Sequence, residues 1–492
     1  MKKLLSIAFL MVVCFSALAN DYVVLASNAV KADAAWSKVV SALAANHNNA
    51  QVFYFNENPD ECLAAVKAAY PRYVGIVDAP ENIGRDYIMR VNRMSRALDD
   101  DIYQDFFWGV ITGYDANNAM EMVNNCVKPL VIESCVSTVM ETEDGKWFKK
   151  YAYTDDQNLG IVGYKDLTKG EPFHRVKVDK LVTATRQRTP QEVTDLLPIF
   201  YDMYKDVDPD LVITASHASQ SALEMPFSAG FIRCKDGKLY AQLPDGNKDL
   251  VQSGKRKLYL PIGNCLIGDV NNTNKSMVPT WTNSAKVCMF IGYVVSTWHG
   301  RSGWGMLKYF LTTPGRYTAP ECFFLNQNDM MFQMNEWYPS LIRENYPHDG
   351  SQRDAAAVIE KATGTKATND QIGFWYDRDV LALYGDPTWN VRLADIPEES
   401  DFTVTSGYEN GQYVITIKTG LNYSPRLISG NYFKTVHVLD LPFSYIFPER
   451  VKNPRLAAGQ RMKVAIDENF ILIYNNRFGP NNEYKIVLDV DK

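Results

Sequence analysis

Short apolar segments alternate with helical patterns over the first part of the chain, and this alternation constrains the fold more than any other feature. The apolar runs lie at 22–25, 52–55, 73–77 and 106–112. The segments between or after them have apolar residues at helical spacing, at 34–45, 59–70 and 116–126. Apolar strands alternating with helices are typical of a mainly parallel sheet covered on both faces. We therefore expect an N-terminal α/β subdomain over 20–135.

A polar segment interrupts this pattern, and the alternation then returns. The segment 136–180 shows no clear period, and we predict an irregular connection there. Afterwards a helix begins at Thr189-Pro190, a cap residue followed by the proline favoured at a first helical position. Apolar strands are predicted at 181–184, 210–214, 258–262 and 287–295. These features indicate a second α/β subdomain over 181–398.

The last part of the chain has a different character. Beyond residue 399, short alternating strands are separated by turn residues such as Asn410-Gly411, and no helical pattern is visible. This composition predicts a β-sandwich over 399–492.

The N-terminus has the pattern of a signal peptide over 1–19. Lys2 and Lys3 precede an apolar run, and Ala17-Leu18-Ala19 is a small-x-small cleavage pattern. The apolar run is too short to span a bilayer, and we predict no transmembrane segment in the mature chain. We expect a bacterial protein that is secreted, periplasmic or attached to the cell surface.

The net charge and the cysteines of the chain limit which binding partners and metal sites can be expected. The formal net charge is −6, with no basic run, so we expect no nucleic-acid partner. Of the 8 cysteines, Cys14 lies in the predicted signal peptide, which leaves an odd number and hence a free thiol. No Cys or His spacing suggests a zinc site.

Two chemically active residues follow predicted strands. His217 comes after the strand at 210–214, and Cys265 comes after the strand at 258–262. Ligands of open α/β sheets bind at the carboxyl ends of the strands, and an imidazole can hold a nearby thiol as the nucleophilic thiolate. We predict a catalytic pair of His217 and Cys265. Two alternatives are an inert, buried Cys265 and His299, after another strand, as the base.

Several motifs in this order resemble the gingipain branch of the caspase-fold cysteine peptidases. They are CLIGD at 265–269, STWH at 296–299 and LYGDPT at 383–388, and the segment 96–113 resembles the family's first subdomain. The resemblance covers most of the chain, from Asp21 to about Leu393. It implies a caspase-like, gingipain-like α/β fold in two subdomains, followed by an immunoglobulin-like β-sandwich.

The resemblance also implies roles for individual residues. Cys265 would be the nucleophile and His217 its base, and the backbone amides of Cys265 and Ala218 would form the oxyanion hole. The family usually has glycine at the position of Ala218, and alanine would be strained there if φ were positive. Trp298 falls at a substrate-pocket position, although it could equally be an ordinary core or surface tryptophan.

An acidic run at 99–101 has three alternative interpretations. Basic-specific members of the family carry Asp-x-x-Tyr here, matched by Asp100 and Tyr103, and such a carboxylate would select a basic substrate side chain. The run could also be a solvated loop. A structural calcium site is the third interpretation, because carboxylate oxygens are calcium ligands.

We therefore expect a secreted cysteine-type endopeptidase that forms a thioester intermediate, with a preference for a basic residue before the scissile bond. We expect a monomer that acts on protein or peptide substrates and requires no cofactor. The alternative is a non-catalytic, gingipain-like binding or surface protein. A serine hydrolase and a dinucleotide enzyme are disfavoured, because the sequence has neither the nucleophile elbow nor the glycine fingerprint after a strand.

Overall fold

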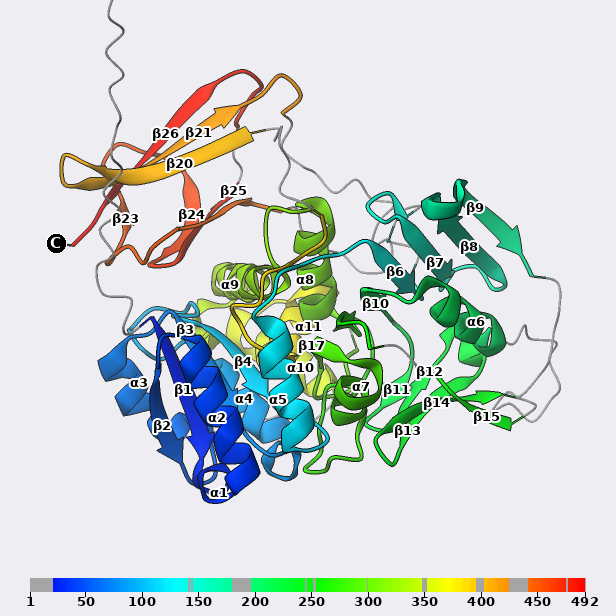
Figure 1. The fold of residues 1–492 in the computed structure, drawn as a ribbon. Coiled ribbons are helices and arrows are strands. Elements are labelled where there is room, and N and C mark those ends of the chain that lie inside the picture. Colours follow the sequence, from blue (N-terminus) through cyan, green and yellow to red (C-terminus); the bar gives the residue numbers. More distant parts are fainter. Residues whose placement is uncertain are drawn as a thin grey trace, which may run out of the picture.

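The computed structural model describes most of the chain in a mixed α/β arrangement with a separate β region at the C-terminus (Figure 1). The predicted signal peptide, the predicted strand at 181–184 and the helix start at 189–190 lie outside the described residues. The described residues are 21–139, 142, 145–178, 196–243, 246–250, 254–298, 300–346, 352–394, 402–423, 441–474 and 477–491.

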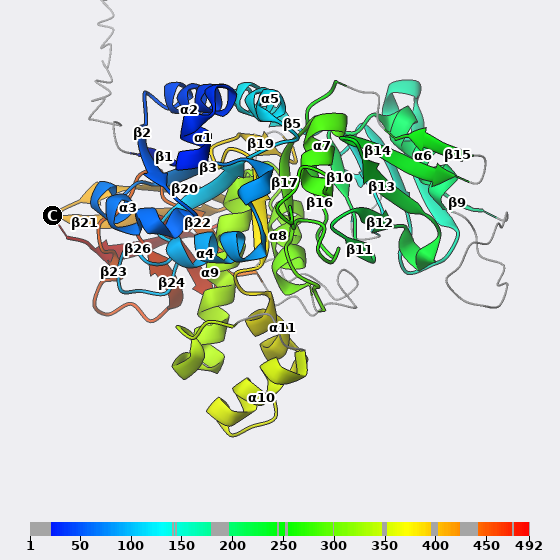
Figure 2. The ribbon, with the colours of Figure 1, turned by 90° about the horizontal axis from the view of Figure 1, so that it is seen from below.

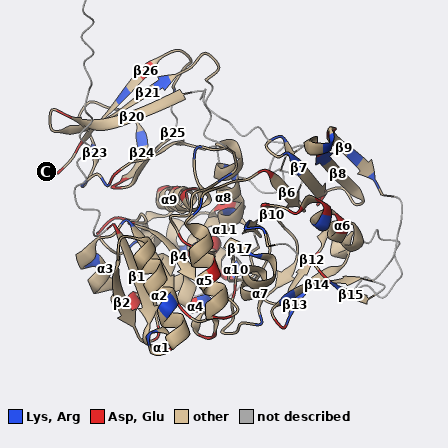
Figure 3. Ribbon diagram, in the orientation of Figure 1, with Lys and Arg blue, Asp and Glu red and all other residues tan. Residues whose placement is uncertain are grey.

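A 12-stranded sheet runs through both α/β parts of the chain. Its first part contains the parallel strands β2 (Gln51–Phe55), β1 (Tyr22–Ser27), β3 (Tyr73–Val77) and β4 (Phe107–Ile111). The strands β1, β3 and β4 are buried almost throughout and are drawn without charged residues in Figure 3, as expected for strands covered on both faces, whereas the edge strand β2 is more exposed. The predicted parallel α/β arrangement is confirmed here.

Helices cover both faces of this sheet. Figure 2 shows α2 (Ala34–Asn46), α5 (Ala116–Cys126) and α7 (Met277–Ala285) on one face. On the opposite face lie α4 (Arg85–Met94), α8 (Arg301–Thr312) and α9 (Ala319–Trp337). The shorter or more peripheral helices are α1 (Asn28–Ala32), α3 (Leu63–Ala69), α6 (Leu197–Val207), α10 (Gln352–Thr363) and α11 (Asn369–Asp377).

Capping side chains fix where several helices begin. Asp33 accepts hydrogen bonds from two amides at the start of α2. The side chain of Thr368 accepts from the amide of Gln371, whose side chain in turn accepts from the Thr368 amide, so that a capping box starts α11. This helix ends at Asp377, a residue that reappears in the candidate site.

The strand direction reverses near the middle of the sheet. The strands β10 (Leu211–Ile213), β16 (Lys257–Leu260) and β17 (Val287–Tyr293) are parallel neighbours. The next strand, β18 (Leu381–Tyr384), is antiparallel to β17 and parallel to β4. The carboxyl ends of β10, β16 and β17 therefore lie at the same sheet edge as the amino ends of β18 and β4.

The predicted irregular segment at 136–180 is wrong, because strands occupy much of it. β6 (Ser134–Ser137) is followed by β7 (Lys150–Thr154), β8 (Ile161–Asp166) and β9 (Glu171–Lys177), which extend the large sheet. Most of β9 is solvent-exposed, so its residues are largely polar. A polar edge strand carries no apolar period, which explains why the sequence pattern did not reveal it.

A small antiparallel sheet is inserted between β10 and β16 and begins directly after His217. Its strands, in order, are β11 (Ala218–Ser219), β12 (Ala222–Glu224), β13 (Phe231–Lys235), β14 (Lys238–Leu243) and β15 (Gly246–Asp249). A further two-stranded sheet pairs β5 (Leu130–Val131) with β19 (Val391–Arg392).

The C-terminal region contains two antiparallel sheets around a shared apolar core. One consists of β20 (Phe402–Glu409), β21 (Gln412–Thr419), β26 (Glu483–Asp489) and β23 (Arg455–Leu456). The other consists of β22 (Phe443–Ile446), β25 (Phe470–Tyr474) and β24 (Lys463–Asp467). The immunoglobulin-like topology remains a prediction, since residues 424–440, between β21 and β22, lie outside the described residues.

Aromatic packing joins the C-terminal region to the α/β part. Phe470 packs edge-on against Phe324 of α9 and against Tyr103, with ring centroids 5.6 and 5.5 Å apart. Tyr474 stacks on Phe332 at 4.1 Å. Among the described helices, none has both the length and the apolar character needed to cross a membrane.

Candidate active site

Cys265 lies in a loop that follows β16 and is held against the end of β17. The Leu266 amide donates to the Val295 carbonyl at 2.9 Å, and the Gly268 amide donates to the Tyr293 carbonyl at the same distance. The half-buried Cys265 thiol itself donates to the Thr297 carbonyl at 3.4 Å. All seven cysteines of the described chain are free thiols, and only Cys234 and Cys265 are not buried.

Close backbone contacts explain the local sequence of this loop. A Cβ atom on Gly268 would lie 2.4 Å from the Gly292 carbonyl oxygen, which leaves room only for glycine. Leu266, next to the thiol, has φ of 58°. This left-handed conformation costs a residue other than glycine about 1 kcal/mol or more, so the packing around the loop must hold it in place.

His217 lies in the neighbouring loop, because β10 and β16 are adjacent and parallel. One buried side chain, Asn264, bridges the two loops. Its Nδ2 donates to the Ser216 carbonyl at 2.8 Å, and its Oδ1 accepts from Thr214 Oγ1 at 2.6 Å. The residue before Cys265 is thus bound to the residue before His217. Asn264 was not among the residues predicted from the sequence, although its place beside the cysteine was a usable signal.

A second bridge joins the far ends of the same loops. Gln220 Nε2 donates to Asp269 Oδ2 at 3.2 Å, and the Asn271 amide donates to Asp269 Oδ1. Burial raises the pKa of Asp269, while these hydrogen bonds oppose the shift. Asp269 of the CLIGD segment therefore has a structural role in aligning the two loops.

The two predicted catalytic side chains reach one edge of the sheet, but the structure does not join them. The His217 side chain is exposed, and within the described residues no hydrogen bond connects it to the Cys265 thiol. Burial raises the pKa of Cys265, and the nearby Asp377 carboxylate raises it further. A thiolate at neutral pH would therefore need a cationic partner such as an imidazolium.

Asp377 is a buried acid that the sequence analysis did not identify. It accepts hydrogen bonds from Tyr293 Oη at 3.2 Å, Thr297 Oγ1 at 3.3 Å and the Ser302 amide at 3.4 Å. Burial raises its pKa to about 6, against the lowering effect of hydrogen bonds from the Ser302 and Arg301 amides. Asp377 thus organises the segment after β17 that also contacts Cys265. It precedes β18, so only the reversed strand direction brings it here.

Trp298 lies beside this centre, directly after the residue that accepts the thiol hydrogen bond. The residue is 59% exposed, so it is a surface tryptophan and not part of the core. Burial raises the pKa of Tyr376, and a hydrogen bond with Trp298 opposes this shift. An exposed indole in this position could contact a bound side chain. His299, the alternative base, lies outside the described residues.

Ala218 occupies the edge strand β11 of the small sheet. It pairs with Leu223, and the Glu224 amide donates to the His217 carbonyl at 2.9 Å. Hydrogen-bonded and non-bonded pairs alternate in an antiparallel ladder, so the Ala218 N–H points away from β12. Its φ is not positive, and alanine is therefore unstrained at this position.

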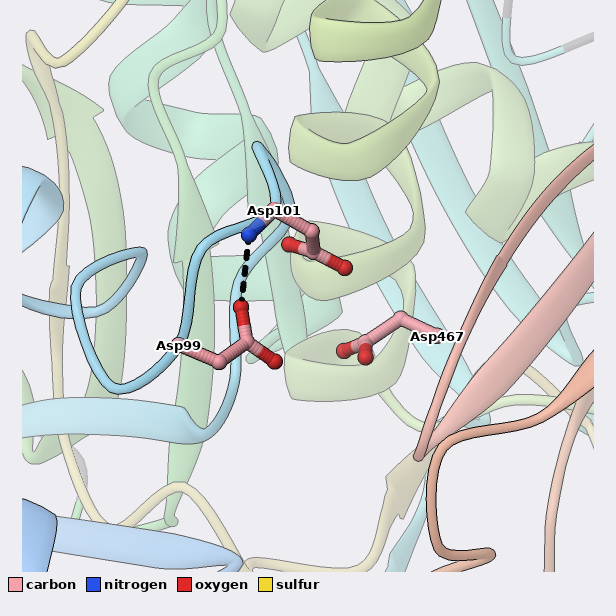
Figure 4. Close-up of side chains that lie close together, drawn as sticks. All are labelled: Asp99, Asp101 and Asp467. Atoms are coloured by element: carbon pink, nitrogen blue, oxygen red, sulfur yellow. Dashed lines mark hydrogen bonds between the residues drawn. The ribbon is translucent and has the colours of Figure 1, made fainter. Parts of the chain in front are cut away.

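Asp100 is exposed in the loop before β4, at the sheet edge that also carries the Cys265 loop. Its backbone carbonyl accepts a hydrogen bond from Arg343. No hydrogen bond or ion pair in the described part of the chain links Asp100 to the Cys265 loop. Its neighbours Asp99 and Asp101 instead lie close to Asp467 of the C-terminal region (Figure 4).

Comparisons with known proteins give likenesses at the level of structure only. The sequence matches no protein-family model and no curated protein. Among solved structures, a crystal structure of the Arg-specific cysteine proteinase gingipain R aligns with 97% of this chain and 92% of its own, at 10% identity and a TM-score of 0.44.

A complex of the pro- and mature domains of Porphyromonas gingivalis RgpB aligns with 96% of this chain and 93% of its own, at 10% identity and a TM-score of 0.42. A third structure, described as a protease, aligns with 82% of this chain and 85% of its own, at 9% identity and a TM-score of 0.36. A function for this chain therefore has to be argued from its own residues.

Proposed function

We propose that this protein is a cysteine-type endopeptidase with Cys265 as nucleophile and His217 as base. The observation that carries the proposal is the Asn264 bridge, which fixes the Cys265 loop against the His217 loop at the carboxyl ends of adjacent parallel strands. This edge is where α/β sheets bind ligands. The half-buried thiol and the exposed imidazole lie on loops that follow neighbouring strands, which supports their pairing in the proposed reaction.

The reaction would proceed through a thioester. The Cys265 thiol proton passes to His217, and the sulfur attacks the carbonyl carbon of the scissile bond. The oxyanion accepts hydrogen bonds from the amides of Cys265 and Ala218. His217 then protonates the leaving amine, and water hydrolyses the thioester and releases the acid product. The Ala218 N–H points away from β12, which supports its role in this scheme.

Substrate preference would come from the rim of the site. Trp298 offers an exposed aromatic surface beside the thiol. The proposal includes a preference for a basic residue before the scissile bond, for which Asp100 would provide the carboxylate. Protein or peptide chains are the substrates, and the enzyme acts as a monomer after export guided by residues 1–19.

Two observations favour a second candidate, a non-catalytic binding protein. The pKa of Cys265 is raised and not lowered, and His217 forms no hydrogen bond to it within the described residues. A homologue that has lost catalytic activity would retain the fold and the hydrogen bonds between the two loops, but its cysteine thiol would not be activated.

Labelling with a peptide-like thiol electrophile that carries arginine tests the two candidates. The matched control is Cys234→Ala, which removes the other thiol that is not buried. The endopeptidase predicts fast labelling that is retained in Cys234→Ala and lost in both Cys265→Ala and His217→Ala. Slow labelling at Cys265 that is indifferent to His217→Ala would favour the binding protein. A lysine or neutral analogue of the same reagent then measures the basic preference separately.

A further inference from the structure

A small cavity lies where α4 ends, between the loop at 342–346 and the segment before β18. Four arginines line it, namely Arg93, Arg96, Arg343 and Arg378. Its volume is about 130 Å³, and a cavity of about 150 Å³ can hold a molecule as large as benzene. The cavity therefore has room for a small ion. Because buried arginines are almost always paired, the acids around it determine whether an anionic ligand could also bind.

One buried acid, Asp379, pairs with three of these arginines. Its carboxylate oxygens lie 2.6 Å from Arg96 Nη2, 3.4 Å from Arg93 Nε and 3.5 Å from Arg378 Nε. Burial alone would raise the pKa of Asp379, yet the charges of the three arginines lower it to about 2. A single carboxylate is thus shared among three cations.

The fourth arginine, Arg343, is exposed and acts on Asp101, which also lines the cavity. Burial raises the pKa of Asp101 to about 6, against the lowering effects of the Tyr103 amide hydrogen bond and the Arg343 charge. Even with both acids ionised, the residues that line the cavity or pair with its arginines comprise four cations and two carboxylates. The cavity therefore carries a formal excess of two positive charges.

Arg378 gives a second, independent indication of an anion. The residue is 2% exposed, and its two terminal nitrogens donate to backbone carbonyls of the loop at 342–346. Its Nε is buried without a hydrogen-bond partner in the described structure. Burial lowers the pKa of Arg378 to about 10, against the raising effect of Asp379, and the charges of Arg96 and Arg93 lower it further. A buried cation among other cations is costly, and an added anion would offset that cost.

We propose that this cavity binds a doubly charged oxyanion, either a phosphate ion or the phosphate group of a monoester. The planar guanidinium group presents pairs of N–H donors that match the spacing of phosphate oxygens. Within the described residues, hydrogen bonds engage only one nitrogen of Arg343 and one of Arg96, which leaves donors for a ligand. A dianion would also neutralise the excess of two positive charges.

A bound anion would connect three segments of the chain. They are the end of α4 with Arg93 and Arg96, the loop with Arg343, and the segment before β18 with Arg378. Arg378 directly follows Asp377 of the candidate active site, but it takes no part in the proposed reaction, so the proposal does not depend on peptidase activity. Because the unfolded chain lacks the assembled cavity, the anion would stabilise the folded protein.

Isothermal titration calorimetry of the full chain with inorganic phosphate, at constant ionic strength, tests the proposal. We expect saturable binding of one phosphate per wild-type chain. Arg343→Gln should raise the Kd about tenfold or more, because a charge-assisted hydrogen bond is lost. The matched control, Arg90→Gln, removes an exposed arginine of α4 that pairs with Asp60 and does not line the cavity. It should bind phosphate like the wild type.

A second variant keeps the test valid if the first does not fold. Arg93→Gln leaves Asp379 paired with Arg96 and Arg378, and it should weaken phosphate binding by a similar factor. Absence of saturable wild-type binding, or equal phosphate affinity in the wild type and both variants, would overturn the site.

Two further titrants define the ligand. Acetate, with a single charge, should bind more weakly than phosphate, and equal affinity would overturn the preference for a dianion. Phosphoserine distinguishes the two sources of the same chemistry. If it binds at least as tightly as phosphate, the site takes phosphate monoesters, whereas tighter binding of inorganic phosphate identifies the free ion as the ligand.

Discussion

Asn264 Nδ2 donates a hydrogen bond to the Ser216 carbonyl at 2.8 Å, and this contact joins the residue before Cys265 to the residue before His217. The Asn264 side chain is completely buried and also accepts from Thr214. It therefore holds the Cys265 loop to the His217 loop, although it would not touch the substrate in the proposed reaction.

The bridge predicts a large effect of Asn264→Ala. The substitution leaves the Ser216 carbonyl without its donor, whereas the Thr214 hydroxyl keeps its hydrogen bond to the Tyr259 hydroxyl. An unsatisfied buried group costs about 1–3 kcal/mol, so we expect the free energy of unfolding, measured with urea, to fall by about that amount, and Cys265 labelling to slow. Asn28→Ala, which removes an exposed side-chain contact, is the control. An unchanged labelling rate would show that the bridge does not position the thiol.

Gly268→Ala should also disturb the cysteine loop. Its Cβ would approach the Gly292 carbonyl oxygen to 2.4 Å, a backbone clash that no side-chain rotation can relieve. We expect a destabilisation of about 1–3 kcal/mol, measured by urea unfolding, together with slower labelling of Cys265. Gly407→Ala is the matched control, because its new Cβ would meet nothing within 4 Å. Equal stability of the two variants would contradict the close packing of this loop.

The proposed oxyanion hole can be tested through Ala218→Pro. Proline removes an N–H that points away from β12, so the ladder keeps its hydrogen bonds, and proline is tolerated on edge strands. Loss of one oxyanion donor typically costs about 100-fold or more in kcat, and we expect such a loss in peptidase assays with little change in Tm. Ala218→Gly, which keeps the N–H, should stay close to the wild type. Full activity of the proline variant would exclude this amide from catalysis.

The pH dependence of Cys265 labelling should reveal whether His217 activates the thiol. Burial and the Asp377 charge raise the pKa of Cys265, so without a cationic partner the thiolate forms only in the alkaline range. In His217→Ala we therefore expect labelling by a small neutral electrophile to be slow at neutral pH and to rise with pH. The wild type should react faster near neutrality, where the imidazolium can hold the thiolate. Superimposable profiles would indicate that no such pair forms.

Asp377 should make stability depend on pH in a defined direction. Its pKa is raised to about 6 in the folded protein, so the folded state binds a proton more tightly than the unfolded chain. The stabilisation by this proton is present at low pH and is lost as pH rises through about 6. A shift of about 2 units corresponds to about 3 kcal/mol. Relative to Asp377→Asn, the wild type should therefore lose about 3 kcal/mol between pH 4 and pH 8 in urea unfolding. A constant difference would contradict the shift.

Local patterns in the sequence predicted many of the strands and helices around the large sheet, and the order along the chain of the two candidate catalytic residues. Because apolar spacing reflects burial on one or both faces, it located β1, β3 and β17 and predicted that His217 and Cys265 follow strands. The parallel pairing of β10 with β16, which places their loops side by side, agrees with that prediction.

Contacts between distant segments depended on the tertiary structure. The antiparallel pairing of β17 with β18 brings Asp377 to the segment near Cys265, and interdomain packing brings Asp467 to Asp99. Neither contact is marked by a periodic pattern in the sequence, because each depends on which elements pack together and in what direction. The exposed strand β9 was not predicted from the sequence either, because a polar strand has no apolar period. The sequence thus determined local elements, while long-range packing decided which of their side chains meet.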